Sequence, residues 1–163
     1  MKKTIILLFI VIGIFSALEV RADTFGYTGS AASSATALAG RIQAYSNGYG
    51  GVNGTGVSMT LKCYVSGAAT NIKMGLYVGT GLVTNGTTDA KNVTNGSPAA
   101  TNTANFTSAP TLSSANTYYL AFQAQAGSTL VYTYDATGDR RYSAGTYPTF
   151  PDPITWTTGA LGQ

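Results

Sequence analysis

Apolar and polar residues alternate along several stretches of the chain, and a period of two residues predicts β-strands. The clearest stretch runs over 57–66, where every second residue is apolar and the others are Ser, Thr, Lys or Tyr. A strand with one buried face and one solvated face produces this pattern. The expected buried face is formed by Val57, Met59, Leu61, Cys63 and Val65.

Other alternating stretches predict further strands. One is expected over 72–78, and we expect it to pair with the strand over 57–66 across a turn at 66–71. Two more are expected over 117–125 and 129–134, joined by a short Gly-containing turn. Shorter strands are expected at 25–28, 41–45, 105–107 and 140–143.

The segment 79–104 differs in composition, since it is rich in Thr, Asn, Gly and Ala. We expect a long loop there, or a loop that holds one short strand around 92–94. Segment 31–38 comes nearest to a helical pattern after the leader, but it lacks an apolar stripe. Short strands separated by Gly-rich and Asn-rich turns predict an all-β fold, an antiparallel β-sandwich of jelly-roll type.

The start of the chain has the pattern of an export signal. Two lysines precede an apolar run over 5–15, and small residues follow just ahead of Asp23. The run is shorter than the roughly 20 apolar residues that span a membrane. We therefore expect a helical signal peptide over 1–22 and one domain over 23–163 that is secreted or held at the cell surface. An uncleaved anchor is the alternative, and the membrane contact is expected only through the leader.

Removal of the leader changes the charge. The whole chain carries a net charge of +3, whereas the remaining domain has six Lys and Arg against five Asp. Near-neutrality argues against a nucleic-acid partner, because the phosphate backbone requires clustered basic residues. It also weakens the repulsion that keeps molecules apart, so self-association is an open alternative.

Residues that carry catalysis are scarce. The chain contains no His, which is the commonest general base and transition-metal ligand. Its Gly-rich runs lack the Lys and the following helix of a phosphate-binding loop. Cys63 falls on an apolar face, which predicts a buried thiol; an intermolecular disulfide is the alternative. We expect a protein that is not an enzyme.

Asp135 and Asp139 flank a short segment that contains Gly138. The first interpretation is that both are turn-forming residues. The alternative is a Ca²⁺ site built from their carboxylates and from backbone oxygens, although the spacing lacks the full pattern of an EF-hand loop. No other cofactor is expected.

Aromatic residues give the positive indication of a binding site. Rings on polar faces or in loops can stack on sugars, and Tyr hydroxyls add hydrogen bonds. Packing within the sheet is the alternative role for each ring. Tyr142, Tyr147 and Trp156 are close in sequence and are the candidate ligand-binding residues. The full set assigned to polar faces or loops is Tyr45, Tyr49, Tyr64, Tyr77, Tyr119, Tyr142, Tyr147 and Trp156.

Five short motifs are spread over most of the chain after the leader. They are Phe25-Gly26-Tyr27, Gly40-Arg41-Ile42, Lys73-Met74-Gly75-Leu76-Tyr77, Tyr118-Tyr119-Leu120-Ala121-Phe122-Gln123 and Tyr147-Pro148-Thr149-Phe150-Pro151-Asp152-Pro153. Together they resemble the β-sandwich modules of large bacterial secreted proteins and of phage structural proteins. Such modules are similar to lectin-like and carbohydrate-binding sandwiches. The resemblance therefore implies a jelly-roll-like fold without an assigned activity.

The chain departs from such modules near its last residues. There a Pro-Asp-Pro segment leads into a closing strand, whereas here only 154–158 precedes the final residues 159–163. Either 154–158 is the last strand, or an open edge remains that would accept a strand from a neighbouring molecule.

Two functions are consistent with this sequence. The first is a secreted, non-catalytic module for extracellular recognition or adhesion, with a glycan or a cell-surface partner. The second is a self-assembling structural subunit of a fibre or surface layer, which the low charge and the abundance of Thr, Gly and Asn favour.

Overall fold

The computed structural model describes residues 33–50, 53–94, 96–134 and 139–158. These residues form antiparallel strands joined by turns and loops, and none of them is helical. Among them there is accordingly no helix that is long and apolar enough to cross a membrane. The expected signal peptide and the expected strand over 25–28 lie outside the described residues.

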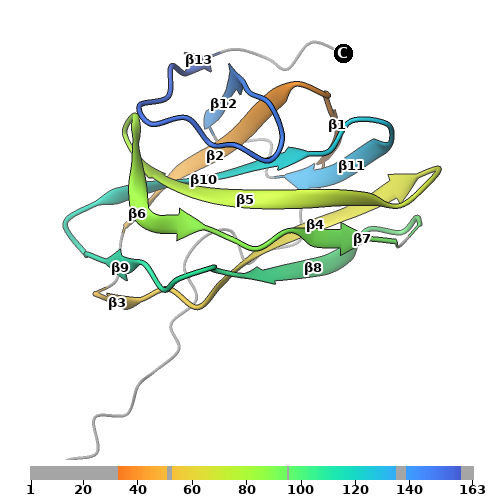
Figure 1. Ribbon diagram of the computed structural model, residues 1–163. Coiled ribbons are helices and arrows are strands. Elements are labelled where there is room, and N and C mark those ends of the chain that lie inside the picture. The colour runs from red at the N-terminus through yellow and green to blue at the C-terminus, as the bar shows by residue number, and fades with distance from the viewer. Residues whose placement is uncertain (1–32, 51–52, 95, 135–138, 159–163) are drawn as a thin grey trace, which may run out of the picture.

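The strands form two main sheets and one small ribbon (Figure 1). The four-stranded sheet has the order β1 (Ser33–Ala37), β11 (Thr129–Tyr134), β4 (Ser58–Ser66) and β8 (Ala100–Asn105). The seven-stranded sheet has the order β13 (Thr157–Thr158), β12 (Asp139–Ala144), β2 (Arg41–Gly50), β10 (Thr117–Ala124), β5 (Thr70–Val78) and β6 (Gly81–Thr87), and β7 (Lys91–Val93) also pairs with β5. The ribbon consists of β3 (Gly54–Thr55) and β9 (Thr111–Leu112).

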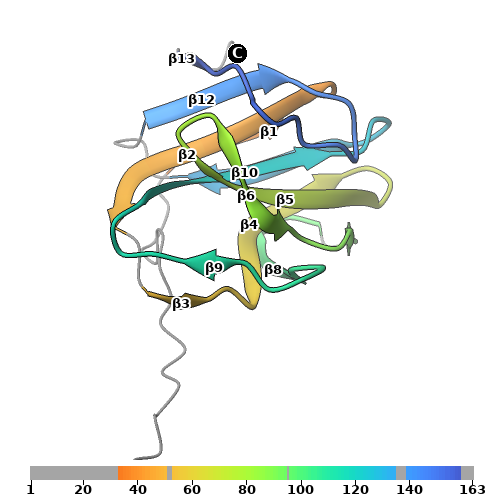
Figure 2. The ribbon, with the colours of Figure 1, turned by 60° about the vertical axis from the view of Figure 1, so that its left-hand side comes forward.

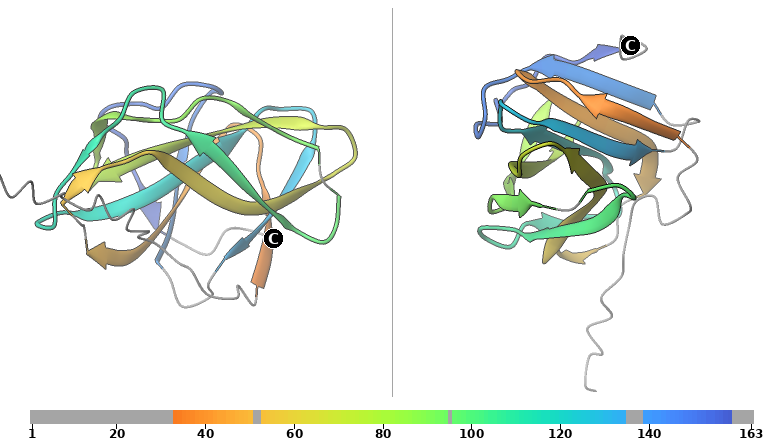
Figure 3. Two further views of the ribbon diagram at one scale, coloured as in Figure 1. Left: turned by 90° about the horizontal axis from the view of Figure 1, so that it is seen from below. Right: turned by 90° about the vertical axis from the view of Figure 1, so that its right-hand side faces the viewer.

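Strand pairing is nested along the chain. The antiparallel pairs are β1 with β11, β2 with β10, β4 with β8, and β5 with β6. Successive strands β1, β2, β4 and β5 alternate between the two main sheets, and β8, β10, β11 and β12 alternate again on the return. Figure 2 shows β12, β2, β10 and β5 in sequence across the seven-stranded sheet, and Figure 3 gives the arrangement from below and from one side. The result is an all-β, sandwich-like protein.

An apolar core fills the space between the two main sheets. Leu76 of β5, Phe122 of β10 and Leu130 of β11 are each at most 2% exposed and belong to one cluster. The alternating patterns over 117–125 and 129–134 are confirmed, because their predicted apolar faces point into this core. Val57 was expected inward but is 73% exposed, since it precedes the first residue of β4.

A second apolar cluster lies on the other face of the seven-stranded sheet. It is closed by the segment 145–156, which we call the strap and which crosses that face (Figure 1, dark blue). The hydrogen bonds that hold the strap include these three: Gln123 Nε2 donates to the carbonyl oxygen of Thr149, the Tyr77 hydroxyl to that of Pro151, and the Ile154 N–H to that of Thr80. The middle of β5, from Met74 to Tyr77, is therefore buried on both faces. The cluster consists of Ile42, Ala44, Tyr77, Ala121, Phe150 and Ile154.

The expectation that the strands over 57–66 and 72–78 pair is wrong. They are β4 and β5, which lie in different sheets: β4 pairs with β8 and β11, and β5 with β6, β7 and β10. The turn at 67–69 carries the chain from one sheet to the other. Period-two alternation identifies each strand, but it does not distinguish a hairpin from a crossing between two packed sheets.

Two weakly patterned segments contain strands that the sequence pattern did not predict. Segment 79–104 is not a long loop, since it contains β6, β7 and the first part of β8; only the short strand around 92–94 was expected. The described part of segment 31–38 contains the strand β1, where the sequence pattern predicted neither a strand nor a convincing helix. The residues that point inward there are small or polar, such as Ala37, Asn102 and Ala104, so a search for large apolar residues does not detect them.

Cys63 is a buried thiol, as expected. It is 0% exposed, and Asn102 Nδ2 donates to its backbone oxygen at 3.2 Å and contacts its Sγ at 3.3 Å. Removal from water disfavours the thiolate and raises the pKa of Cys63 to about 11.

We therefore expect the folded protein to react very slowly with a thiol reagent such as DTNB at pH 8, because little thiolate exists and access is blocked. Reaction should become complete in denaturant. Fast, stoichiometric labelling of the folded protein would contradict the buried position.

Candidate functional site

Trp156 lies at the end of the strap and packs against the seven-stranded sheet. Its Nε1 donates a hydrogen bond to the carbonyl oxygen of Gly79 at 2.8 Å. Its ring meets Tyr77 edge-on, with 5.3 Å between centroids, and lies tilted over Tyr119 at 6.2 Å. These contacts give Trp156 a role in holding the strap, and the ring is only partly exposed.

Tyr142 lies on the opposite face of the same sheet. Its register partner in β2 is Gln43, whereas Ile42 and Ala44 on either side belong to the cluster under the strap. The Arg41 guanidinium lies over the Tyr142 ring, 4.7 Å from its centroid. Tyr142 and Trp156 therefore do not form a shared aromatic platform.

Two aromatic residues that were assigned to polar faces or loops, Tyr77 and Tyr45, pack instead in the apolar clusters. Tyr77 is 0% exposed beneath the strap. Tyr45 lies between the sheets, where its hydroxyl donates to the Tyr132 hydroxyl at 2.9 Å, and burial raises the pKa of Tyr45 well above its usual value. Burial also raises the pKa of Tyr132 to about 12. The side chain of Tyr49 lies outside the described residues.

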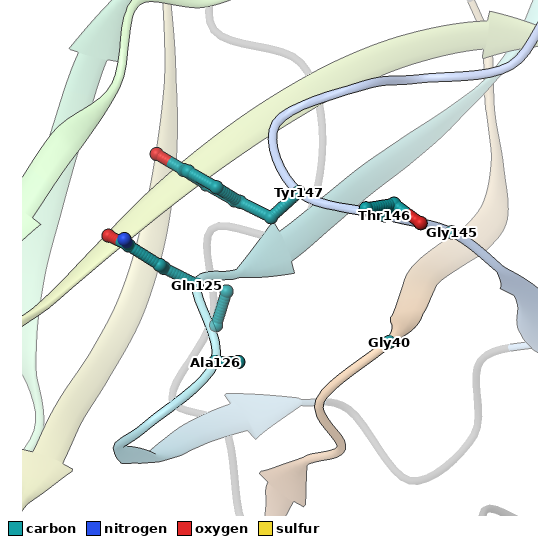
Figure 4. Close-up of a pocket in the computed structure, with 7 residues that line it drawn as sticks. Gly40, Gln125, Ala126, Gly145, Thr146 and Tyr147 are labelled. Atoms are coloured by element: carbon teal, nitrogen blue, oxygen red, sulfur yellow. The ribbon is translucent and has the colours of Figure 1, made fainter.

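Tyr147 differs from the other two candidates, because it lines an open pocket at the start of the strap. The pocket has a volume of about 270 Å³. It lies where three segments meet: the turn before β2, the end of β10 and the residues after β12 (Figure 4). The lining residues are Gly40, Ala124, Gln125, Ala126, Gly145, Thr146 and Tyr147.

The frame of the pocket is held by the backbone. Gly40 has a φ of +74°, a left-handed conformation that favours glycine at the turn between β1 and β2. The Gly145 N–H donates to the Gly40 carbonyl oxygen at 3.0 Å, which joins this turn to the start of the strap. The side chains of Tyr147 and Gln125 extend in the same direction from their two loops (Figure 4).

A row of side-chain amides leads away from the pocket across the sheet. Asn71 Nδ2 donates to Gln125 Oε1 at 2.9 Å, and Asn92 Nδ2 donates to Asn71 Oδ1 at 3.0 Å. We call Gln125, Asn71 and Asn92 the amide row. In each of these two bonds an amide nitrogen donates to the amide oxygen of the next residue toward Gln125. The two atoms left at the ends of the row, Gln125 Nε2 and Asn92 Oδ1, have no partner among the described residues. One end of the row can therefore donate a hydrogen bond and the other can accept one.

The pocket and the amide row together combine an aromatic ring with neutral hydrogen-bonding groups. Tyr147 is half-buried, and burial raises the pKa of its phenol, so the hydroxyl is neutral at physiological pH. A ring beside amide donors and acceptors is suited to a ligand that has apolar faces and many hydroxyl groups. The seven lining residues include no Lys, Arg, Asp, Glu or Cys.

The predicted Ca²⁺ site is not addressed by the described part of the chain. Asp135 lies outside it, and so does the side chain of Asp139, whose backbone begins β12 opposite Ser46. Among the described residues, no group of three or more His, Cys, Asp or Glu could hold a metal ion. The Asp135–Asp139 site stays a prediction.

The fold defines the class of this protein as an all-β sandwich-like protein, and the comparisons add no narrower family. No protein-family model, no curated protein and no solved structure matches the chain.

The sequence offered Tyr147 as a candidate but did not single out the amide residues near it. Asn71 was assigned to a turn, Asn92 to a loop or to a short strand within it, and Gln125 to a strand end, so nothing linked them along the chain. Their proximity follows from the pairing of β5 with β7, in which Asn71 is the register partner of Asn92. The one feature that these three amide residues share in the sequence is their position at the beginning or end of a predicted strand. That position does not show that they lie together in the fold.

Proposed function

We propose that this protein is a secreted, non-catalytic recognition module that binds an extracellular glycan at the Tyr147 pocket. The observation that carries the proposal is the Tyr147 ring beside Gln125, at the start of the amide row. A sugar ring would stack on Tyr147, and its hydroxyls would exchange hydrogen bonds with the amides. The export pattern of the leader supports an extracellular location.

We further infer that the sandwich is of the jelly-roll type. Eight strands form four nested antiparallel pairs, and consecutive strands alternate between two sheets on both the outward and the return path. A double sheet made of two Greek keys has this organisation. Jelly rolls occur among lectin domains and also among the subunits of viral capsids. The architecture is therefore compatible both with glycan recognition and with a structural role.

A glycan array probed with the labelled protein tests the proposal. We expect selective binding to a subset of saccharides, and Tyr147→Ala should weaken it by about tenfold or more, because a stacked ring contributes roughly 1 kcal/mol beyond its buried area. Tyr64→Ala is the matched control, since Tyr64 is also half-exposed but lies in β4, in the other sheet.

The protein applied to the array is first separated by size exclusion. Equal loss of binding in both variants, or binding unchanged by Tyr147→Ala, would remove the pocket from the proposal. Elution as a polymer with no saccharide bound would favour the alternative, a self-assembling subunit of a fibre or surface layer.

A further inference from the structure

Lys73 lies on the same face of β5 as Asn71, one row farther along the strand. Asn71 and Lys73 are two residues apart, so their side chains point to the same side of the sheet. The register partner of Lys73 in β10 is Gln123, which the strap partly covers through the Thr149 carbonyl oxygen. Lys73 therefore lies between the amide row and the strap that carries Tyr147.

The ammonium group of Lys73 has no ion-pair partner in the described part of the chain. Asp152 accepts a hydrogen bond from the Leu82 N–H at 3.1 Å, and Asp89 accepts one from the Thr107 hydroxyl at 2.9 Å. The two carboxylates whose side chains are described are thus bonded to other groups. Lys73 is half-buried, so its charge is less shielded by water than that of a fully exposed lysine.

A positive charge beside neutral amides changes the expected chemistry of the ligand. The amide row and Tyr147 suit any saccharide with hydroxyl groups, but they do not select for charge. A carboxylate placed toward Lys73 would form a charge-assisted hydrogen bond, which is roughly twice as strong as a neutral one. No described acidic side chain competes for this position.

We propose that the ligand is an acidic saccharide, with a uronic-acid carboxylate bound by Lys73 and with its rings on Tyr147 and the amide row. This inference rests on the proposed glycan function and adds the charge of the ligand. The carboxylate, not the sugar ring, makes the contact with Lys73. Binding should consequently weaken as salt screens the pair.

Calorimetric titration with matched saccharides tests the inference. The probes are oligomers of galacturonate, alginate and hyaluronan, each beside its carboxyl-reduced form, at low and at high salt. For the oligomer that binds best, we expect the acidic form to bind about tenfold more tightly, the difference between a charged and a neutral hydrogen bond. Lys73→Gln should remove that preference, and Lys62→Gln, in the other sheet, should retain it.

The outcomes separate the inference from the function on which it rests. Equal binding of the acidic and reduced forms, or an unchanged preference in Lys73→Gln, overturns the role of Lys73 while Tyr147-dependent binding can still hold. Absence of binding to every saccharide on the array and in this set overturns the glycan function and the inference with it.

Discussion

Replacement of Phe122 by alanine is expected to lower the free energy of unfolding by about 4 kcal/mol, the usual range for a buried aromatic residue cut to a methyl group. Phe122 is 2% exposed in the core between the sheets. Its ring meets that of Tyr132 edge-on, with 4.8 Å between centroids, which adds a specific aromatic contact to the apolar area. Chemical denaturation followed by circular dichroism measures the change.

The control for this variant is Val57→Ala. Val57 is 73% exposed, so the loss of two methyl groups should change stability by less than about 0.5 kcal/mol. A Phe122→Ala protein as stable as Val57→Ala would mean that β10 does not face the opposite sheet.

Gly75→Val is expected to cost about 2 kcal/mol and to displace the strap, because the site has no room for a side chain. A Cβ atom at Gly75 would lie 2.8 Å from Cδ1 and 2.9 Å from Cε1 of the Phe150 ring. Trp156 is the sole tryptophan of the chain and packs where the strap ends. Its fluorescence should therefore shift toward that of a water-exposed indole when the strap moves.

A double mutant identifies the cause of the Gly75 effect. With Phe150→Ala also present, the added methyl groups have space, so the combined loss of stability should be smaller than the sum of the two single losses. Gly96→Val is the matched control, since a Cβ there meets nothing within 4 Å. Additive losses, or an unchanged Trp156 emission, would contradict the packing of Phe150 on β5.

The strap connects the stability of the fold to the proposed site. The start of the strap is fixed by the hydrogen bond between Gly145 and Gly40. Its middle and its end are fixed by the packing of Phe150 and Trp156 and by hydrogen bonds from side chains of β5 and β10. Tyr147 lies between these anchors. The pocket is therefore formed by packing that needs no ligand, so little ordering should oppose binding.

Sequence patterns predicted the strands that carry large apolar residues. The faces of 117–125 and 129–134 were assigned correctly because each stretch has large apolar or aromatic residues at every second position, among them Phe122 in the first and Leu130 and Tyr132 in the second. Strands with small or polar inward residues, such as β8 with Asn102 and Ala104, escaped the same reasoning. Asn102 can be buried because its amide donates hydrogen bonds to backbone oxygens, and a pattern of hydrophobic residues does not reveal such a position.

The candidate site was predictable only in part. Tyr147 was chosen with Tyr142 and Trp156 because the three are close in sequence, but sequence proximity does not fix the face on which a ring lies. Arg41 stacks on Tyr142 and the sheet holds Trp156, whereas Tyr147 is one of the residues that line the pocket between the turn before β2 and the strap. Tyr77 was assigned to a polar, outward face by alternation; it does point away from the core between the sheets, but the strap buries it, so the assignment is wrong. A covering segment of this kind cannot be inferred from a period of two.

Glycan recognition at the Tyr147 pocket can be tested directly by an NMR titration of the labelled protein with the saccharide that binds best on the array. We expect the amide shifts to concentrate on Gly40, Gln125, Ala126 and Tyr147 and on the side-chain amides of Asn71 and Asn92. The outer face of the other sheet, marked by the Thr60–Thr103 hydroxyl pair, should not respond. Shifts confined to that outer face, with none around Tyr147, would contradict glycan binding at the pocket.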